Sequence, residues 1–468
     1  MAWDEESTDS EAKAKHDGIS WSAYTYQVVI VGAGFLADAY DLFVIDLVMS
    51  ILDRLHPGGL TASDKSLIAG ATLLGAIFGQ LSFGLLGDFL GRRWTFLLTC
   101  VLIVFGAVLS GCTVWVENSA FGLVGQLVLC RFLLGVGVGG EYPLAATIAS
   151  EAASPKHRGA LIAGVFSMQG WGMLLSCLLV LFLLWIGVSL EWTWRIVLIF
   201  GAVPSAAVIF VRTKMEETTI FKEAQQEQHQ HGFYYHWQST LESLRAHWRL
   251  LVGTTMTWLL LDVTFYGTGS FKHKIASSLH LGHHATNDRD AVWEEALFAT
   301  LCSCMAIPGY LLSIAFVDKL GRYEIQFWGF LAIAANFFLV AGLNLSGRGP
   351  PAIMILCFGL TFLFSNFGPN TTTFMLPAEV YPTMVRATCH GLSAASGKLG
   401  AAIGTMAFSP FEAKYGIEAV LTSCGVVCLI GAAVTYGFTP RVVAVELSEL
   451  EGLVLGPSKI QSEKSHSF

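Results

Sequence analysis

Charged side chains are scarce in this sequence. Asp, Glu, Lys and Arg together make up 13% of its 468 residues, whereas 54% of the residues are hydrophobic. A typical soluble protein contains about 25% charged residues, and no soluble fold of this length buries so much apolar surface. The shortage of charge therefore excludes a soluble globular protein and indicates an integral membrane protein.

The sequence also lacks the motifs of an enzyme or of a metal site. No nucleotide-binding loop and no pairing of a nucleophile with a base occurs near the few ionisable residues of the apolar stretches. The ten cysteines lie almost all within apolar stretches and lack zinc-like spacing, so we interpret them as small packing groups. The histidines of 228–232, with His236, are interpreted as part of a solvated linker. We expect no cofactor, no bound metal and no nucleic-acid partner.

Long apolar runs fill most of the chain. A bilayer core about 30 Å thick requires about 20 apolar residues per crossing. Twelve windows meet this requirement: 25–51, 66–89, 94–115, 121–153, 159–188, 193–212, 250–270, 294–317, 324–345, 351–376, 386–411 and 416–438. The predicted fold class is therefore all-α, a polytopic membrane protein with twelve transmembrane helices in the lipid bilayer.

Polar segments at the ends and in the middle of the chain separate two groups of six apolar windows. We expect an N-terminal tail (1–24), a six-helix bundle (25–212), a central loop (213–249), a second six-helix bundle (250–438) and a C-terminal tail (439–468). Most Lys and Arg residues fall in segments on one side of the membrane, and the positive-inside rule then places both termini in the cytoplasm. The polar residues 1–20 do not form a cleavable secretory signal. The expected location is the plasma membrane.

One loop motif occurs in both halves. After the second window the chain reads GLLGDFLGRR, with Asp88 and Arg92, and after the eighth it reads SIAFVDKLGRYE, with Asp318 and Arg322. A repeated six-span unit with such a loop resembles the major facilitator superfamily, which implies two pseudo-symmetric halves. Each acid can cap the next helix and pair with a neighbouring base, so the loop is a candidate latch between conformations. The alternative is a basic loop that sets the topology and has no gating role.

Asp262 lies at the centre of an apolar window, in LVGTTMTWLLLDVTFYGTG. A carboxylate at that depth costs about 2.5–3.5 kcal/mol, so it normally faces a partner, a water-filled cavity or a solute. Trp258 and Tyr266 lie four residues to either side of Asp262, on the same helical face. The three residues predict a polar binding wall. The alternative is an acid paired with a buried base for structure only.

Other windows contribute a small set of polar residues: Asp38, Asp41, Arg131, Glu141, Tyr142, Gln169, Asn366, Asn370 and Lys398. Because these residues and Asp262 come from six different windows, we expect them to converge on one central cavity between the halves. Lys398 lies among Ser, Ala and Gly, where its ammonium requires an anion, either a solute or a fixed carboxylate. Three carboxylates are candidates to pair with Arg131, namely Glu141, Asp38 and Asp41.

The charge balance at membrane depth favours coupling to protons. Four acids and two bases are expected there: Asp38, Asp41, Glu141, Asp262, Arg131 and Lys398. An anionic solute would be repelled by the excess of ionised acids, and low dielectric screens this repulsion poorly. Protonation of an acid removes part of the repulsion, so crowded buried acids act as proton acceptors. The sequence therefore predicts anion uptake that is driven by an inward proton gradient.

Several motifs together resemble one family of this superfamily. They are DAYDLF, GGEYPLAATIASE, the window from Trp258 to Gly267, the VDKLGR loop and the long segment from Asn366 to Gly404. They are similar to those of the phosphate:proton symporters of plants and fungi. This resemblance implies a secondary active transporter that imports inorganic phosphate by alternating access, with the substrate bound at midplane between the halves.

The same resemblance implies which residues serve the transport. Phosphate would bind the residues that match the family's site, namely Tyr142, Gln169, Trp258, Asp262, Tyr266 and Asn370, with Lys398 nearby. Asp38 and Asp41 would take part in proton passage, together with Glu141 and Asp262. A phosphate hydroxyl can donate to Asp262, which favours partly protonated phosphate. The expected partners are therefore inorganic phosphate, protons and, as an analogue, arsenate.

The sequence departs from the family pattern at three places. Glu141 stands where the family usually has Asp, the central loop begins with MEETTIF, and the tail TPRVVAVELSELEG lacks the usual motif. None of these changes removes a proposed phosphate contact. Two alternatives stay open: a transporter of another solute, such as an organic anion, a sugar or an arsenate-like oxyanion, and a phosphate receptor that signals through the central loop. The sequence leaves the oligomeric state open.

Overall fold

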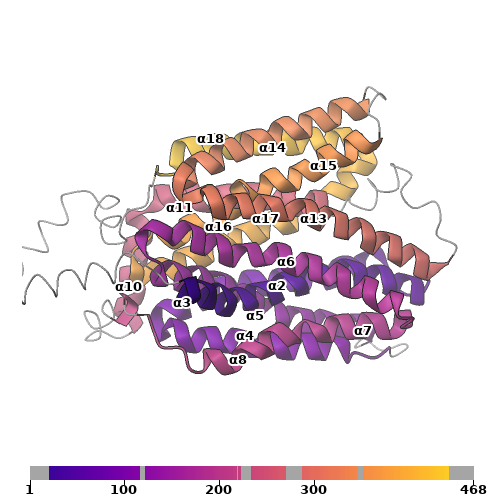
Figure 1. The fold of residues 1–468 in the computed structure, drawn as a ribbon, viewed down its shortest axis with the longest axis horizontal. Helices are drawn as coiled ribbons and strands as arrows, with labels where there is room; N and C mark the ends of the chain where they lie inside the picture. The colour runs from indigo at the N-terminus through magenta and orange to yellow at the C-terminus, as the bar shows by residue number, and fades with distance from the viewer. Residues whose placement is uncertain are drawn as a thin grey trace, which may run out of the picture.

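The structure, a computed structural model, describes residues 21–115, 122–218, 220–222, 233–269, 287–345 and 351–441. Within these ranges every regular element is a helix, which confirms the all-α fold class. Figure 1 shows the helices of the first half gathered on one side and those of the second half on the other. The tails 1–24 and 439–468 lie largely, and the histidine stretch 228–232 lies wholly, outside the described residues.

Helical passes of the first half match the first six windows. They are α2 (Trp21–Leu55), α3 (Ala62–Leu90), α4 (Arg92–Gly111), α5 (Leu123–Ala152), α6 (Arg158–Trp185) and the pair α7 (Leu190–Phe200) and α8 (Ala202–Arg212). A short 3-10 turn, η1 (Pro155–His157), precedes α6. The sixth pass is broken at Gly201, where a Cβ would overlap the carboxylate of Asp41. The glycine therefore makes room for a buried acid.

Helical passes of the second half repeat this order. They are α11 (Trp248–Gly269), α13 (Asp288–Leu320), α14 (Arg322–Leu345), the pair α15 (Pro351–Asn366) and α16 (Pro369–Glu379), α17 (Arg386–Tyr415) and α18 (Ile417–Phe438). A second 3-10 turn, η2 (Thr383–Val385), precedes α17. The break between α15 and α16 falls at Gly368, because Pro369 disfavours helical backbone in the residue before it. Proline and glycine thus place Asn370 in the first turn of a new helix.

Nine helices in the described ranges are long and apolar enough to cross a membrane. The passes α2, α15–α16 and α17 are not among them. These three passes carry Asp38, Asp41, Asn370 and Lys398. The other candidate residues at membrane depth, among them Glu141, Gln169 and Asp262, lie on helices that do meet the criterion.

Small residues allow very close helix packing in the first half. Gly135 and Gly139 of α5 face α3, and a Cβ on either would overlap the backbone carbonyl of Thr72 or of Ala76. Glycine at such positions lets two membrane helices approach each other at backbone distance. The close packing of α3 against α5 consequently fixes the position of the polar side chains of α5.

The two ends of the bundle differ. At one end α3, α5 and α13 finish and α4, α6 and α14 begin, and we call this the basic end because it carries Arg92, Arg158, Arg322 and Arg386. At the opposite end, which we call the open end, a cavity of about 350 Å³ lies between the halves, lined by α2, α3 and α6 and by α11, α13 and α17. This cavity therefore opens between the two halves at the end opposite the basic end.

The central loop was expected to be a solvated linker, but part of it packs on the basic end. Helix α10 (Phe233–Ala246) lies there (Figure 1, left). Glu217 accepts hydrogen bonds from the backbone N–H groups of Arg92 and Arg93 at 3.0 and 3.2 Å, and thereby caps α4. The buried ring of Phe221 lies 3.8 Å from the guanidinium carbon of Arg92. A charged loop segment is thus ordered because it supplies a helix cap and a cation–π contact.

Candidate functional site

The polar stripe expected on one helical face lies on α11. Trp258, Asp262 and Tyr266 follow one another at four-residue intervals in this helix. Trp258 and Asp262 are buried, whereas Tyr266 is partly exposed and lines a small cavity. The Oδ2 atom of Asp262 lies 3.6 Å from the Nζ atom of Lys398 on α17. The acid at the centre of α11 therefore has a buried counter-charge.

Phenol rings also surround the ammonium of Lys398. Its Nζ donates a hydrogen bond to the hydroxyl of Tyr266 at 2.9 Å. The same atom lies 4.7 Å from the ring centre of Tyr266 and 4.9 Å from that of Tyr142, within the range of cation–π attraction. Tyr142 belongs to α5 and Lys398 to α17, so this charge lies where the two halves meet.

Amides and a further phenol form a second polar group beside the first. The Oε1 atom of Gln169 accepts hydrogen bonds from the hydroxyl of Tyr310 at 2.8 Å and from Nδ2 of Asn370 at 3.2 Å. Asn370 Nδ2 also donates to Oδ1 of Asn366 at 2.7 Å. Tyr310 lies close enough to Tyr266 for the two phenols to interact electrostatically. The two groups therefore form one central site, with Gln169 and Tyr142 from the first half.

Sequence reasoning did not identify Tyr310 as part of this site. The residue follows Pro308 and Gly309 in α13, within an otherwise apolar stretch. A phenol at that depth requires a hydrogen-bond partner, and this requirement was the available signal. Tyr310 matters because it connects α13 of the second half directly to Gln169 on α6.

The central site combines several hydrogen-bond donors with one positive charge and one carboxylate. Lysine, tyrosine, tryptophan, asparagine and glutamine side chains all present donors, and charge-assisted bonds to such donors are the strong ones. Asp262 presents an acceptor at the same place. Among the described residues no group of three or more His, Cys, Asp or Glu side chains lies close enough together to hold a metal ion.

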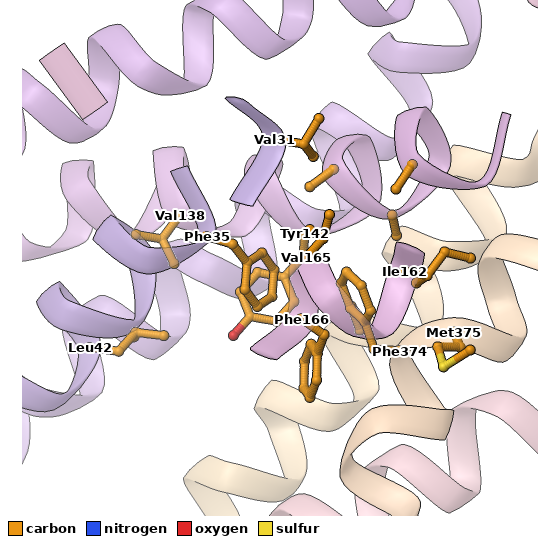
Figure 2. Packing of buried hydrophobic residues seen from close by; sticks show 14 of the residues in the cluster. Val31, Phe35, Leu42, Val138, Tyr142, Ile162, Val165, Phe166, Phe374 and Met375 are labelled. Carbon is orange, nitrogen blue, oxygen red and sulfur yellow. The ribbon is translucent and has the colours of Figure 1, made fainter. Parts of the chain in front are cut away.

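An aromatic cluster closes the central site toward the basic end. The rings of Phe35, Tyr142, Phe166 and Phe374 pack together with centre-to-centre distances of 4.6 Å for Phe35–Tyr142, 5.1 Å for Phe35–Phe374 and 4.7 Å for Phe166–Phe374 (Figure 2). Phe374 lies one helical turn beyond Asn370 toward the basic end, and Phe166 lies in the same relation to Gln169. We call these four rings the aromatic floor.

Two acids of α2 are buried without hydrogen bonds to their carboxylates. Asp38 and Asp41 are both fully buried, and within the described ranges none of their carboxylate oxygens has a hydrogen-bond partner. Desolvation of an ionised carboxylate is costly unless it is paired or protonated. These two groups are therefore placed where binding a proton is favourable.

Glu141 is paired with Arg212 rather than with Arg131, which corrects one of the expected pairings. Both guanidinium Nη atoms of Arg212 bond to the carboxylate of Glu141, and Thr99 donates to Glu141 Oε2 at 2.7 Å. Arg212 was not among the residues expected at membrane depth, although it ends α8 and its side chain is buried. The physical reason is that a fully buried carboxylate needs a counter-charge, and the long arginine side chain reaches it from the end of α8.

Arg131 has polar contacts of another kind. Its Nη2 donates to the backbone carbonyl of Asp41, and its Nε donates to the hydroxyl of Thr72 at 3.2 Å. Arg131 thus bonds to the backbone of α2 rather than to a carboxylate of this helix, and it also interacts electrostatically with Asp41. The count of two bases at membrane depth is also corrected, because Arg212 is a third.

Replacing Gly34 by Ala should destabilise the protein. A Cβ at Gly34 would overlap both the carboxylate of Glu141 and the guanidinium of Arg212, so the buried pair would have to move. Overpacking of this kind costs about 1–3 kcal/mol. The effect is measured as a lower thermal unfolding temperature of the purified protein in detergent. Gly342→Ala on α14 is the matched control, because nothing lies within 4 Å of a Cβ there. An equal, small effect of both substitutions would contradict this packing.

The two repeated loop acids each cap a helix of the opposite half. Asp88, near the end of α3, accepts hydrogen bonds from the backbone N–H groups of Ala387 at 3.2 Å and Thr388 at 2.7 Å, in the first turn of α17. Asp318, near the end of α13, accepts from Gly159 at 3.0 Å and Ala160 at 2.8 Å, in the first turn of α6. The expectation was that each acid caps the next helix in the chain. Each instead crosses to the other half, so the two caps join the halves at the basic end.

Buried ion pairs accompany both caps. Arg92 lies 3.1 Å from Asp88 and 3.2 Å from Glu151, and Glu151 also pairs with Arg386 at 3.1 Å. In the second half Arg322 lies 2.9 Å from Asp318 and 2.7 Å from Glu379. The Glu151–Arg386 pair joins the two halves directly.

Sequence reasoning missed Glu151, Glu379 and Arg386, although a signal was present. The sequence has Glu151 seven residues before Arg158, and Glu379 seven residues before Arg386, at equivalent places of the two halves. In each case a proline-containing 3-10 turn or its cap lies between the acid and the base. This second repeat is the counterpart of the repeated Asp–Gly–Arg loop.

Comparison with known proteins agrees with this geometry. The sequence pattern described as sugar (and other) transporter matches residues 25–453. Probable inorganic phosphate transporter 1-2 of Arabidopsis thaliana is 34% identical, over 91% of this chain and 94% of its own length. Inorganic phosphate transporter 1-1 of Oryza sativa subsp. japonica is 37% identical, over 81% of this chain and 82% of its own length.

One solved structure shares the fold at low sequence identity. The major facilitator superfamily proton:xylose symporter XylE from E. coli superposes with a TM-score of 0.75 at 19% identity, and the alignment covers 92% of this chain and 99% of that chain. At this identity the likeness establishes the fold alone. The expected major facilitator fold is thereby confirmed.

Proposed function

The chain belongs to the sugar (and other) transporter family of the major facilitator superfamily and is related to plant inorganic phosphate transporters, and we propose that it imports inorganic phosphate by proton symport. As a member of this family it is a transporter and not an enzyme. The observation that carries the proposal is the buried pair of Asp262 and Lys398, with Tyr266 beside it, at the meeting of the two halves.

This group suits dihydrogen phosphate. Lys398 supplies the positive charge, and the phenols and amides supply donors for the unprotonated oxygens. Asp262 supplies an acceptor for a phosphate hydroxyl. Tyr142, Gln169, Trp258 and Asn370 complete the proposed binding set, which draws side chains from both halves.

The charges at membrane depth support coupling to protons. The buried acids Asp38, Asp41, Glu141 and Asp262 number four, and the buried bases Arg131, Arg212 and Lys398 number three, which leaves one negative charge when all are ionised. A phosphate monoanion would raise this to two negative charges in a region of low dielectric. A proton that arrives with the anion offsets the added charge. We assign proton coupling to these four acids.

The two ends support alternating access. The open end has the cavity of about 350 Å³, and the basic end is closed by the aromatic floor and by the Asp88 and Asp318 caps. We place the basic end in the cytoplasm, following the positive-inside rule, and the protein in the plasma membrane with both termini inside. The structure then corresponds to a state that receives substrate from outside, and release requires the two caps to break.

Phosphate uptake into liposomes that contain the purified protein tests the proposal. An inward proton gradient should drive accumulation, because each pH unit supplies about 1.4 kcal/mol per transported proton. Uptake of labelled phosphate is measured with and without the gradient and with a protonophore. Arsenate should compete, whereas sulfate should not, because sulfate has no hydroxyl to donate to Asp262. Binding of phosphate without net uptake would instead support a receptor, and uptake insensitive to the gradient would refute proton symport.

A further inference from the structure

Asp46 lines two cavities at the open end. Besides the cavity of about 350 Å³ there is a smaller one of about 70 Å³. Both are lined by Asp46, Phe43 and Leu73, among others. Asp46 is exposed, in contrast to Asp38 and Asp41 on the same helix. Of the acids on α2, Asp46 is thus the one that solvent can reach from both cavities, whereas the partly exposed Asp53 pairs with Lys65 nearer the helix end.

The smaller cavity approaches both buried charge groups. On one side it touches Thr72, whose hydroxyl accepts a hydrogen bond from Arg131, and Arg131 in turn donates to the backbone carbonyl of Asp41. On another side it touches Tyr266, whose hydroxyl accepts from Lys398. Asp46 is the carboxylate among the residues that line this cavity. A volume of about 70 Å³ accommodates water molecules, because one water requires only about 10–15 Å³.

The charges around Asp46 come from several helices. Arg131 of α5 and Tyr266 of α11 both interact electrostatically with it. Lys65 of α3, Cys177 of α6 and Glu295 of α13 line the larger cavity with Asp46. Lys65 pairs with Asp53 at 2.6 Å, and Glu295 pairs with Arg54 at 2.7 Å, so these two charges are compensated by partners of their own. The lining residues of α17 carry no charge.

From this arrangement we infer that Asp46 is the group that collects protons at the open end and delivers them to Asp41. This inference rests on the proposed proton symport and adds the place where the proton is taken up. A proton moves from water in the larger cavity to a carboxylate oxygen of Asp46, which becomes a neutral acid. The acid then releases the proton to water in the smaller cavity and regains its negative charge. That water passes a proton to the carboxylate of Asp41, which becomes neutral, so charge and protons balance.

Asp46→Asn tests the inference in liposomes that contain the full chain and an internal pH dye. Addition of inorganic phosphate outside should start proton and phosphate uptake together. In the variant both initial rates should fall by about tenfold or more at alkaline external pH, where protons are scarce, and by less at acidic pH. Exchange of labelled for unlabelled phosphate at equal pH should stay unchanged, because it needs no net proton movement. Asp46→Glu should restore the wild-type rates.

Glu295→Gln is the matched control, because Glu295 lines the larger cavity but not the smaller one. This variant should keep the wild-type pH dependence. Wild-type proton uptake by Asp46→Asn would overturn the inference, and so would an equal loss of exchange, which would place Asp46 in phosphate binding. Proton-independent uptake by the unaltered protein would refute the proposed symport, which distinguishes the two failures.

Discussion

Lys398→Ala is expected to lower phosphate uptake by about 100-fold or more. Breaking one partner of a buried ion pair costs about 3–5 kcal/mol, because the other charge stays buried without compensation. Here the remaining charge is the carboxylate of Asp262, which lies 3.6 Å from the lost ammonium and would repel the arriving anion. Since each 1.4 kcal/mol corresponds to a tenfold change, the loss should be plain in initial rates of labelled phosphate uptake.

The control for this prediction lies on the same helix. Lys414 is exposed near the end of α17, and Lys414→Ala should transport like the unaltered protein. Asp262→Asn should also lose most uptake, because it removes the acceptor for the phosphate hydroxyl. Phosphate uptake near the normal rate by both Lys398→Ala and Asp262→Asn would show that the substrate binds elsewhere.

Asp88→Asn should shift the protein toward opening at the basic end by about 10- to 100-fold. Hydrogen bonds to a charged group contribute about 1.5–3 kcal/mol, and Asp88 accepts two from the first turn of α17 and one from the hydroxyl of Thr388. The neutral amide keeps the shape of the side chain but loses its charge and one acceptor. The favourable interaction with the helix N-terminus is therefore weakened.

A native cysteine reports this opening. Cys389 of α17 is buried and lies close enough to Asp88 to interact with it electrostatically. Its rate of modification by a maleimide, followed by mass spectrometry, should rise in Asp88→Asn and in the pseudo-symmetric Asp318→Asn. Asp53→Asn at the open end is the control, because its ion pair with Lys65 is partly exposed and far from the basic end, so its loss should leave the rate unchanged. An unchanged rate in both cap variants would mean that the caps do not hold the basic end closed.

The features that the sequence predicted well are those that depend on one helix or on one energetic rule. Helical periodicity alone places Trp258, Asp262 and Tyr266 on one face of α11. The cost of burying an ammonium predicts that Lys398 has an anionic neighbour, and Asp262 is that neighbour. The all-helical membrane fold followed in the same way from the length of the apolar runs.

The features that escaped prediction join distant parts of the chain. Arg212 is the last residue of α8, and its pairing with Glu141, 71 residues away, depends on how α8 packs against α2 and α4. Tyr310 and Gln169 are 141 residues apart and meet across the two halves. The caps from Asp88 and Asp318 span 300 and 159 residues, so local capping rules pointed to the wrong helices. Long-range pairing of this kind is decided by tertiary packing, which one sequence does not encode in a local pattern.

Helix α17 links the central charge to the closure of the basic end. It is one continuous helix from Arg386, which pairs with Glu151 of the first half, past Lys398 beside Asp262. These two residues are twelve positions apart, or about 18 Å along the helix axis. The passes α7–α8 and α15–α16 are interrupted, whereas no break lies between Arg386 and Lys398. The backbone of this segment is therefore an unbroken helix between the two residues. A displacement of Lys398 along the helix axis on substrate arrival or departure also displaces Arg386, and so acts directly on its ion pair with Glu151.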